Sequence, residues 1–194
     1  TEREIDDQPE HITDTHAPKR PMSLPCDIHR ATVKGEGYLV LVGLMDDRPY
    51  EIFAGLSQCV DVPKRVKRGE LIKNGKVDGT TAYNLRIPLG DDDELVLKNV
   101  VQLFDNPLYG ALTRTMSLSL RHGVPVRYLV EQLRRDKHSD LQSFSAVVAR
   151  VLAKNYISDG AAVTGDTCRN CGSRDLSYVE GCVTCAGCGN SKCS

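Results

Sequence analysis

GYLVLVGLM, residues 37–45, is the apolar run on which the prediction of the fold rests. Similar runs of β-branched and aromatic residues lie at 26–33 and 48–55, and turns that contain Gly or Asp separate the three runs. Residues of these types favour extended strands, whereas Gly and Asp favour the tight turns between strands. The sequence therefore predicts three antiparallel strands in this region.

The strand pattern continues for two more runs and then changes to a helical pattern. Strands are predicted at 65–79 and 81–89, with Asn74–Gly75 as a tight hairpin turn. After an acidic turn at 90–94, apolar residues recur at the three-and-four spacing of amphipathic helices. Four helices are predicted, at 94–104, 106–123, 124–137 and 140–157.

The order of these elements predicts the fold class. Asn106 before Pro107 is suited to a helix N-cap, and Gly123 is suited to a helix end. Strands first and helices afterwards predict an α+β fold, an antiparallel sheet followed by a helical layer. A small C-terminal zinc ribbon is expected in addition, because four cysteines of that segment form two C-x-x-C motifs. The predicted divisions are a disordered linker or tail at 1–20, an α+β domain at 21–157, a linker at 158–166 and a zinc ribbon at 167–194.

Composition narrows the classes of function. The formal net charge is -1, so no overall positive field attracts nucleic acid or an anionic membrane. No apolar run approaches the length of a membrane span, and the acidic start does not resemble a signal peptide. We expect a cytoplasmic protein, and because the chain begins at Thr1, a processed or excised piece of a longer polypeptide.

Six of the eight cysteines lie in the last 27 residues, CRNCGSRDLSYVEGCVTCAGCGNSKCS (168–194). Cys168 with Cys171 and Cys185 with Cys188 form two C-x-x-C-G motifs, a spacing that allows four thiolates to surround one tetrahedral zinc ion. A second partition takes Cys182 and Cys185 as the other half-site, although no glycine follows that pair. The motifs therefore predict a zinc site, with the first partition preferred.

Two cysteines remain under either partition. We call each C-x-x-C-G turn a knuckle. If Cys185–Cys188 is the second knuckle, the two strands of a hairpin on either side of it place Cys182 opposite Cys193, within reach of a disulfide. Under the other partition the spare pair is Cys188 and Cys193. The register of a short hairpin is weakly determined. It is therefore equally consistent with the sequence that the two cysteines do not pair, with Cys182 an incidental core residue and Cys193 an idle exposed thiol.

The rest of the chain contains no complete active site by sequence. Its histidines are scattered, and the acids Asp91–Asp93 are interpreted as a solvated turn that complements the dipole of the predicted helix. Cys26 and Cys59 have no partner spacing, so burial is expected for both. The basic residues at 64–68 are interpreted as a solvated edge strand, because aromatic residues typical of single-strand binders are missing between them.

Three stretches together resemble a known family: RPMSLPCDIHRATVKGEGYLVLVGLMDDRPYEIFAG (20–55), ALTRTMSLSLRHGVPVRYLVEQL (111–133) and EGCVTCAGCGNSKC (180–193). They are similar to the C-terminal region of adenosylcobalamin-dependent (class II) ribonucleotide reductases, including the domain that in some bacteria is a separate small subunit. The ending is the most specific of the three. In contrast to many relatives, the first hairpin has VKGEGYLVLV and no Cys-Gly.

The resemblance implies that the catalytic barrel and the adenosylcobalamin site lie outside this segment. It also implies that a C-terminal dithiol, which Cys182 and Cys193 match, re-reduces the active-site disulfide during deoxyribonucleotide synthesis. Thioredoxin or glutaredoxin would then reset the dithiol. The expected partners are the catalytic part of the reductase and one of these proteins, with no membrane and no nucleic acid. The alternative is a non-catalytic zinc-ribbon module that binds nucleic acid or a protein.

Overall fold

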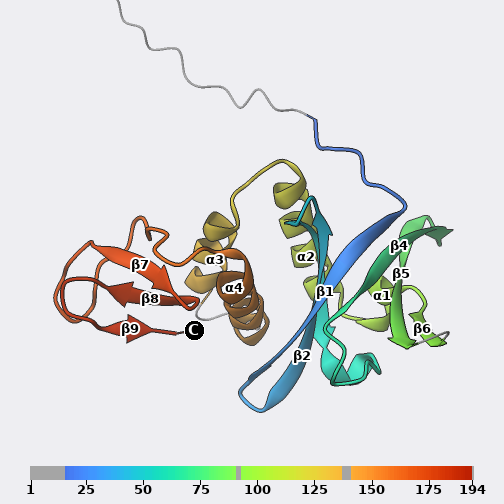
Figure 1. The fold of residues 1–194 in the computed structure, drawn as a ribbon, viewed down its shortest axis with the longest axis horizontal. Coiled ribbons are helices and arrows are strands. Elements are labelled where there is room, and N and C mark those ends of the chain that lie inside the picture. Colours follow the sequence, from blue (N-terminus) through green and yellow to red (C-terminus); the bar gives the residue numbers. More distant parts are fainter. Residues whose placement is uncertain (1–15, 91–92, 137–140, 194) are drawn as a thin grey trace, which may run out of the picture.

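The computed structural model describes residues 16–90, 93–136 and 141–193, and its larger sheet has six antiparallel strands (Figure 1). Its strands are β1 (Ser23–Val33), β2 (Glu36–Met45), β3 (Arg48–Leu56), β4 (Arg68–Val77), β5 (Thr80–Gly90) and β6 (Asp93–Leu97), in the spatial order β3-β2-β1-β4-β5-β6. A short 3-10 turn, η1 (Ser57–Cys59), follows β3.

The helices follow the sheet in the sequence, and a second, small sheet follows the helices. The helices are α1 (Val100–Leu103), α2 (Pro107–Arg121), α3 (Val126–Arg135) and α4 (Gln142–Tyr156). The small sheet has the order β7 (Leu176–Val179), β8 (Cys182–Cys185) and β9 (Ser191–Lys192), and it lies beside α3 and α4 (Figure 1). The predicted α+β class is therefore confirmed. Within the part of the chain described, no helix has the length and apolar character needed to cross a bilayer.

Strand β2 is buried on both faces of the sheet. Tyr38, Val40 and Val42 belong to a core cluster on the helical face, whereas Leu39 and Leu41 belong to a second cluster on the opposite face. Because neighbouring residues of a strand point to opposite faces, a strand covered on both sides is apolar at every position. Burial of β2 on both faces therefore explains the continuous apolar run at 37–45.

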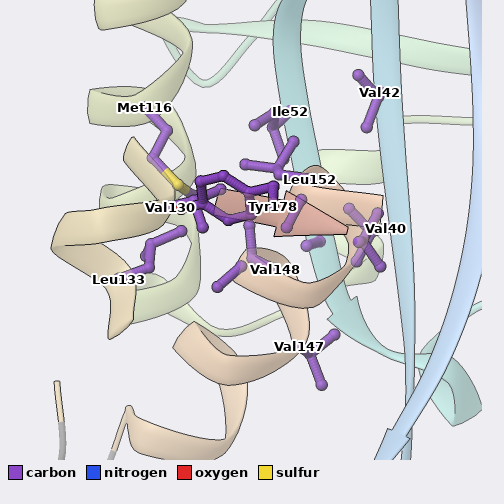
Figure 2. Close-up of a cluster of buried hydrophobic side chains, with 14 of the residues drawn as sticks. Val40, Val42, Ile52, Met116, Val130, Leu133, Val147, Val148, Leu152 and Tyr178 are labelled. Atoms are coloured by element: carbon purple, nitrogen blue, oxygen red, sulfur yellow. The ribbon is translucent and has the colours of Figure 1, made fainter. Parts of the chain in front are cut away.

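The helical-face cluster joins the sheet to all three long helices (Figure 2). Met116 of α2, Val130 of α3 and Leu152 of α4 pack in it, and the last two are fully buried. Tyr178 of β7 lies in the same cluster. The small sheet therefore shares its core with the helices.

The opposite face of the sheet is closed by a second cluster without a long helix. Leu71 of β4 and Ile87 of β5 pack there with residues of β1 and β2. Val60 after η1, Val100 of α1 and Phe104 complete the cluster. The short elements α1 and η1 thus cover the face that the long helices leave open.

The predicted hairpin turn at Asn74–Gly75 is wrong. Both residues lie inside β4, where the pairing with β5 is irregular between Lys73 and Lys76. The turn is formed by Asp78 and Gly79, whose φ angles are 49° and 77°. Two successive positive φ angles are typical of a type I′ hairpin turn, and Asp-Gly satisfies this requirement as well as Asn-Gly does.

The predicted helix at 94–104 is also wrong. Its first half is β6, which pairs with β5 from Leu97 opposite Leu85 onward, and its second half is the single turn α1. Along β6, Leu95 and Leu97 are half-buried while Val96 is exposed, which is an alternation of period two. Asp91 and Asp92 of the predicted acidic turn lie outside the described residues.

The basic residues at 64–68 do not form an edge strand. Lys64, Arg65 and Lys67 precede β4 in a loop, and only Arg68 belongs to the strand. Strand β4 lies between β1 and β5, so it is an interior strand of the sheet. The end of the loop runs beside β1, where the N–H of Ile28 donates to the carbonyl of Lys67 at 2.8 Å.

The boundaries of α2 agree with the sequence. The side chain of Asn106 accepts hydrogen bonds from the N–H groups of Leu108 and Tyr109, at 3.0 and 3.1 Å, and Pro107 is the first helical residue. At the other end, Gly123 has a φ of 78° and donates to the carbonyl of Leu120. The predicted N-cap and helix end are confirmed.

A buried carboxylate connects the start of the described chain to the sheet and to α2. Glu51 of β3 is fully buried, and its two oxygens accept hydrogen bonds from Arg20 at 2.9 and 2.6 Å. Arg121 of α2 donates to the same carboxylate at 3.3 Å. Arg20 also donates to the carbonyl of Leu71. The residue at the end of the predicted tail is therefore a structural partner of a buried charge.

We predict that Arg20→Met lowers the free energy of unfolding by about 3 kcal/mol, because removal of one partner leaves a buried charge without its main compensation. Urea unfolding measures the change. Arg114→Met, on the exposed side of α2, is the matched control and should change the value by less than about 0.5 kcal/mol. Equal effects of the two substitutions would contradict the structural role of Arg20.

Candidate metal centre and cysteine pair

The first C-x-x-C-G motif forms a tight turn ahead of β7. The N–H of Cys168 donates to the carbonyl of Ser173, and the carbonyl of Cys168 accepts from the N–H of Gly172, both at 2.8 Å. Gly172 has a φ of 74°, which residues with a side chain rarely adopt. The glycine after the second cysteine is thus required by the turn that brings Cys168 and Cys171 together.

The second motif repeats this geometry. The N–H of Cys185 donates to the carbonyl of Asn190, and its carbonyl accepts from the N–H of Gly189, both at 2.9 Å. The φ of Gly189 is 71°. The sequence Cys182–Cys185 has no glycine in this position and instead forms β8. The two knuckles are therefore structurally equivalent.

The sulfur atoms of the two knuckles form one cluster. Those of Cys168 and Cys188 lie 3.6 Å apart, as do those of Cys171 and Cys185, and all four lie within 4.8 Å of one another. A tetrahedral zinc site with Zn–S bonds of about 2.3 Å has sulfur–sulfur separations of about 3.8 Å. The four residues could therefore hold a metal ion, and their donor set and spacing fit zinc.

Hydrogen bonds in the knuckles favour thiolates at two of these positions. The pKa of Cys168 is lowered to about 6, first by the backbone N–H of Cys171 and then by that of Asn170. The pKa of Cys188 is also lowered, first by the side chain of Asn170 and then by the backbone N–H of Asn190. Because a metal binds the thiolate and not the thiol, this arrangement prepares the site for a cation.

The exposed Cys171 shows why the cluster needs that cation. The backbone N–H of Ser173 lowers the pKa of Cys171, but the neighbouring sulfurs of Cys188 and Cys185 outweigh it and raise the pKa to about 12. Without a positive ion, adjacent sulfurs resist ionising together. A divalent cation would remove this penalty, since it attracts all four thiolates at once.

The two remaining cysteines of the ribbon form a disulfide, Cys182–Cys193, with α-carbons 4.4 Å apart. Strands β8 and β9 pair Val183 with Lys192 and Thr184 with Ser191, the register that continues to Cys182 and Cys193. Cys193 is exposed and Cys182 is half-buried. The structure thus separates the six cysteines as the preferred partition does, and it does not bring Cys188 and Cys193 together as a pair.

The ribbon is fixed to the helices through Tyr178. This side chain is 1% exposed and packs in the helical-face cluster, near Val130 and Leu152 (Figure 2). The guanidinium of Arg134 lies 5.2 Å above its ring and donates to the carbonyl of Gly181 at 3.1 Å. These contacts join residues far apart in the sequence and were not predicted from it. An aromatic residue in a cysteine-rich segment was the only available signal for them.

The segment predicted as a linker, 158–166, runs beside β7. Gly160 and Val163 donate from their N–H groups to the carbonyls of Tyr178 and Leu176, and the N–H of Tyr178 donates to the carbonyl of Ala161. These hydrogen bonds attach the segment to the ribbon. The division of the chain into domains stays a prediction.

The other cysteines lie away from this centre. Cys26 is buried in the second core cluster, and burial is the main cause that raises its pKa. Cys59 is half-buried at the end of η1 and packs against the same cluster. Neither belongs to the cluster of four sulfurs.

We predict that replacing any of Cys168, Cys171, Cys185 and Cys188 by serine lowers the zinc content and unfolds the ribbon, because metal binding and folding are coupled in so small a unit. Cys182→Ser and Cys193→Ser should keep one equivalent of zinc. Elemental analysis of the purified variants measures the difference. Zinc loss in Cys182→Ser with retention in Cys188→Ser would reverse the partition.

We also predict that Gly181→Ala weakens the attachment of the ribbon. A Cβ atom on Gly181 would lie 2.7 Å from the α-carbon of Lys154, and the φ of 78° is unfavourable for alanine. The expected loss is about 2 kcal/mol. Hydrogen exchange at Tyr178 measures it. The control is Gly187→Ala, whose added Cβ would have contacts no shorter than 3.4 Å, and equal exchange in both variants would contradict this prediction.

A known family model matches most of the chain. The family described as NrdJ homologue C-terminal domain matches residues 24–158, which include β2 to β6 and all four helices. The match ends before the cysteine cluster and the disulfide. No curated protein and no solved structure matches the chain. Since the match covers more than half of its length, the chain belongs to the NrdJ homologue C-terminal domain family.

Proposed function

We propose that this chain is the C-terminal part or an accessory subunit of a cobalamin-dependent ribonucleotide reductase. In this proposal Cys182 and Cys193 form the dithiol that re-reduces the active-site disulfide during deoxyribonucleotide synthesis. The family match supports the relation to NrdJ and hence an association with this reductase. The observation that carries the redox role is the Cys182–Cys193 disulfide, exposed at Cys193, beside four sulfurs arranged for a metal.

The proposed exchange transfers two electrons and two protons. In the reduced ribbon, one thiolate of the pair attacks a sulfur of the active-site disulfide, forms a mixed disulfide and releases one active-site thiolate. The second thiol of the pair then attacks the ribbon sulfur of the mixed disulfide. The active site regains two thiols, and the ribbon is left with the Cys182–Cys193 disulfide.

Exposure assigns the two roles within the pair. Cys193 is exposed beyond β9, whereas Cys182 is half-buried at the start of β8. An incoming disulfide therefore reaches Cys193 first, and Cys182 resolves the mixed disulfide. Thioredoxin or glutaredoxin would return the pair to the dithiol by the same exchange and become oxidised in turn. Adenosylcobalamin would be held by the catalytic part, where it supplies radical chemistry.

The metal site would have a structural role in this scheme. Zinc has no redox chemistry of its own, and its bonds would occupy the thiolates of Cys168, Cys171, Cys185 and Cys188. Those four sulfurs would then not compete with Cys182 and Cys193 for the incoming disulfide. The zinc knuckles would also fix the hairpin on which the pair depends.

The test adds this chain to a catalytic fragment of the reductase that lacks it. We predict that the wild-type chain restores multiple turnovers driven by thioredoxin, whereas Cys182→Ser or Cys193→Ser limits the reaction to about one turnover. A small dithiol reaches the active site directly, so turnover with it should be the same for all variants. Cys59→Ser, which changes a cysteine outside the pair, is the matched control.

A second readout does not need the catalytic fragment. Thioredoxin should reduce the Cys182–Cys193 disulfide, and alkylation followed by mass spectrometry should locate two new thiols at these positions with the zinc content unchanged. Full thioredoxin-driven turnover by Cys193→Ser would contradict the proposal, as would a disulfide that thioredoxin leaves intact.

A further inference from the structure

A basic pocket lies on the side of the molecule formed by β1, the loop before β4 and the end of α4. Its volume is about 640 Å³, within the range of small-molecule sites. Its walls carry six cationic side chains that come from three separate parts of the sequence. They are Arg30, Lys64, Lys67, Arg68, Arg150 and Lys154.

Asp27 is the one acidic side chain among the described residues that line the pocket, and it is already engaged. Asp27 accepts a hydrogen bond from the hydroxyl of Tyr156 at 2.9 Å, and its other oxygen lies 3.6 Å from the Nε atom of Arg68. His29 contacts the same hydroxyl at 2.8 Å. Because the tyrosine hydroxyl donates to Asp27, its oxygen accepts from the Nε2–H of His29. This chain of contacts directs the carboxylate toward Tyr156 and Arg68.

Several of the cationic groups have no acidic counterpart in the described part of the chain. Lys64, Lys67 and Lys154 are exposed, and none forms an ion pair with a described residue. Arg30 has a different role: it donates to the carbonyls of Val62, Pro63 and Val66 and thereby holds the loop over β1. The loop that carries Lys64 and Lys67 is therefore positioned by the pocket's own arginine.

The geometry points to a polyanion of small size. The three lysines without a described acidic partner carry more positive charge than a ligand with a single carboxylate would neutralise. Lysine and arginine are also the side chains that bind phosphate. A nucleic-acid strand would need a track of aromatic residues for its bases, whereas the described residues that line this pocket include no Phe, Tyr or Trp. We propose that the pocket binds a polyphosphate chain, either free or as part of a nucleotide.

The experiment is calorimetric titration of the full chain with inorganic tripolyphosphate and with ATP, at about 50 mM and about 150 mM salt. Binding of both ligands with similar affinity assigns the site to the phosphate chain. Binding of ATP at least about tenfold more tightly assigns it to a nucleotide. Either result supports the proposal, and the absence of binding by both at the lower salt concentration overturns it.

A triple variant, Lys64→Gln/Lys67→Gln/Lys154→Gln, keeps most of each side-chain stem and removes three charges from the pocket. It should bind at least about tenfold more weakly. The matched control is Lys73→Gln/Lys76→Gln/Lys98→Gln, which removes the same charge from exposed positions outside the pocket lining. If both variants bind the ligands equally weakly, the loss of affinity comes from the change in net charge, and the proposed binding site is wrong.

Two competing ligands complete the test. A single-stranded oligonucleotide and an acidic peptide are titrated under the same conditions. If either binds more tightly than tripolyphosphate and loses affinity in the pocket variant, the pocket belongs to a macromolecular partner and the proposal is wrong. Thermal unfolding of both triple variants checks that the fold is unchanged. Because no cysteine takes part, the result is independent of the redox function proposed above.

Discussion

The convergence of four sulfur atoms on one point is the constraint on which the ribbon depends. The 27 residues from Cys168 onward contain few large apolar side chains, so a core alone gives them little stability. The two knuckles instead meet at their sulfurs, and each knuckle is closed by the same pair of backbone hydrogen bonds. With the second knuckle in place, the register of β8 and β9 is determined, and that register sets Cys182 opposite Cys193.

Attachment to the helices is the second constraint, and it depends on one aromatic side chain. Tyr178 inserts between α3 and α4 and becomes part of a cluster that extends to β2 and β3 (Figure 2). Full burial of an aromatic side chain contributes about 2 to 3 kcal/mol, which is a large share of the stability of so small a sheet. Arg134 adds a contact over the ring and a hydrogen bond to Gly181, the residue before Cys182. The position of the disulfide is therefore linked to the core of the whole chain.

Local signals in the sequence were sufficient for most elements, whereas long-range contacts explain the error at 94–104 and the contacts that were not predicted. The run at 37–45, the cap at Asn106 and the paired C-x-x-C-G motifs each follow from the chemistry of a few neighbouring residues. The stretch at 94–104 was misjudged because its pairing with β5 competes with a helical pattern, and a sequence window does not contain its partner strand. The roles of Arg20 and Tyr178 depend on residues far away in the chain. No local pattern could have predicted them.

A redox-active pair beside four other thiols presents a chemical difficulty, because any free thiolate can attack the disulfide and exchange partners with it. Six cysteines allow 15 fully paired arrangements. The ribbon limits this freedom in two ways. Side chains three positions apart on a strand point to opposite faces, so Cys182 and Cys185 leave β8 in opposite directions. A metal bound by the cluster would hold the other four thiolates. Cys182 and Cys193 could then be reduced and reoxidised to the same disulfide, without exchange with those four sulfurs.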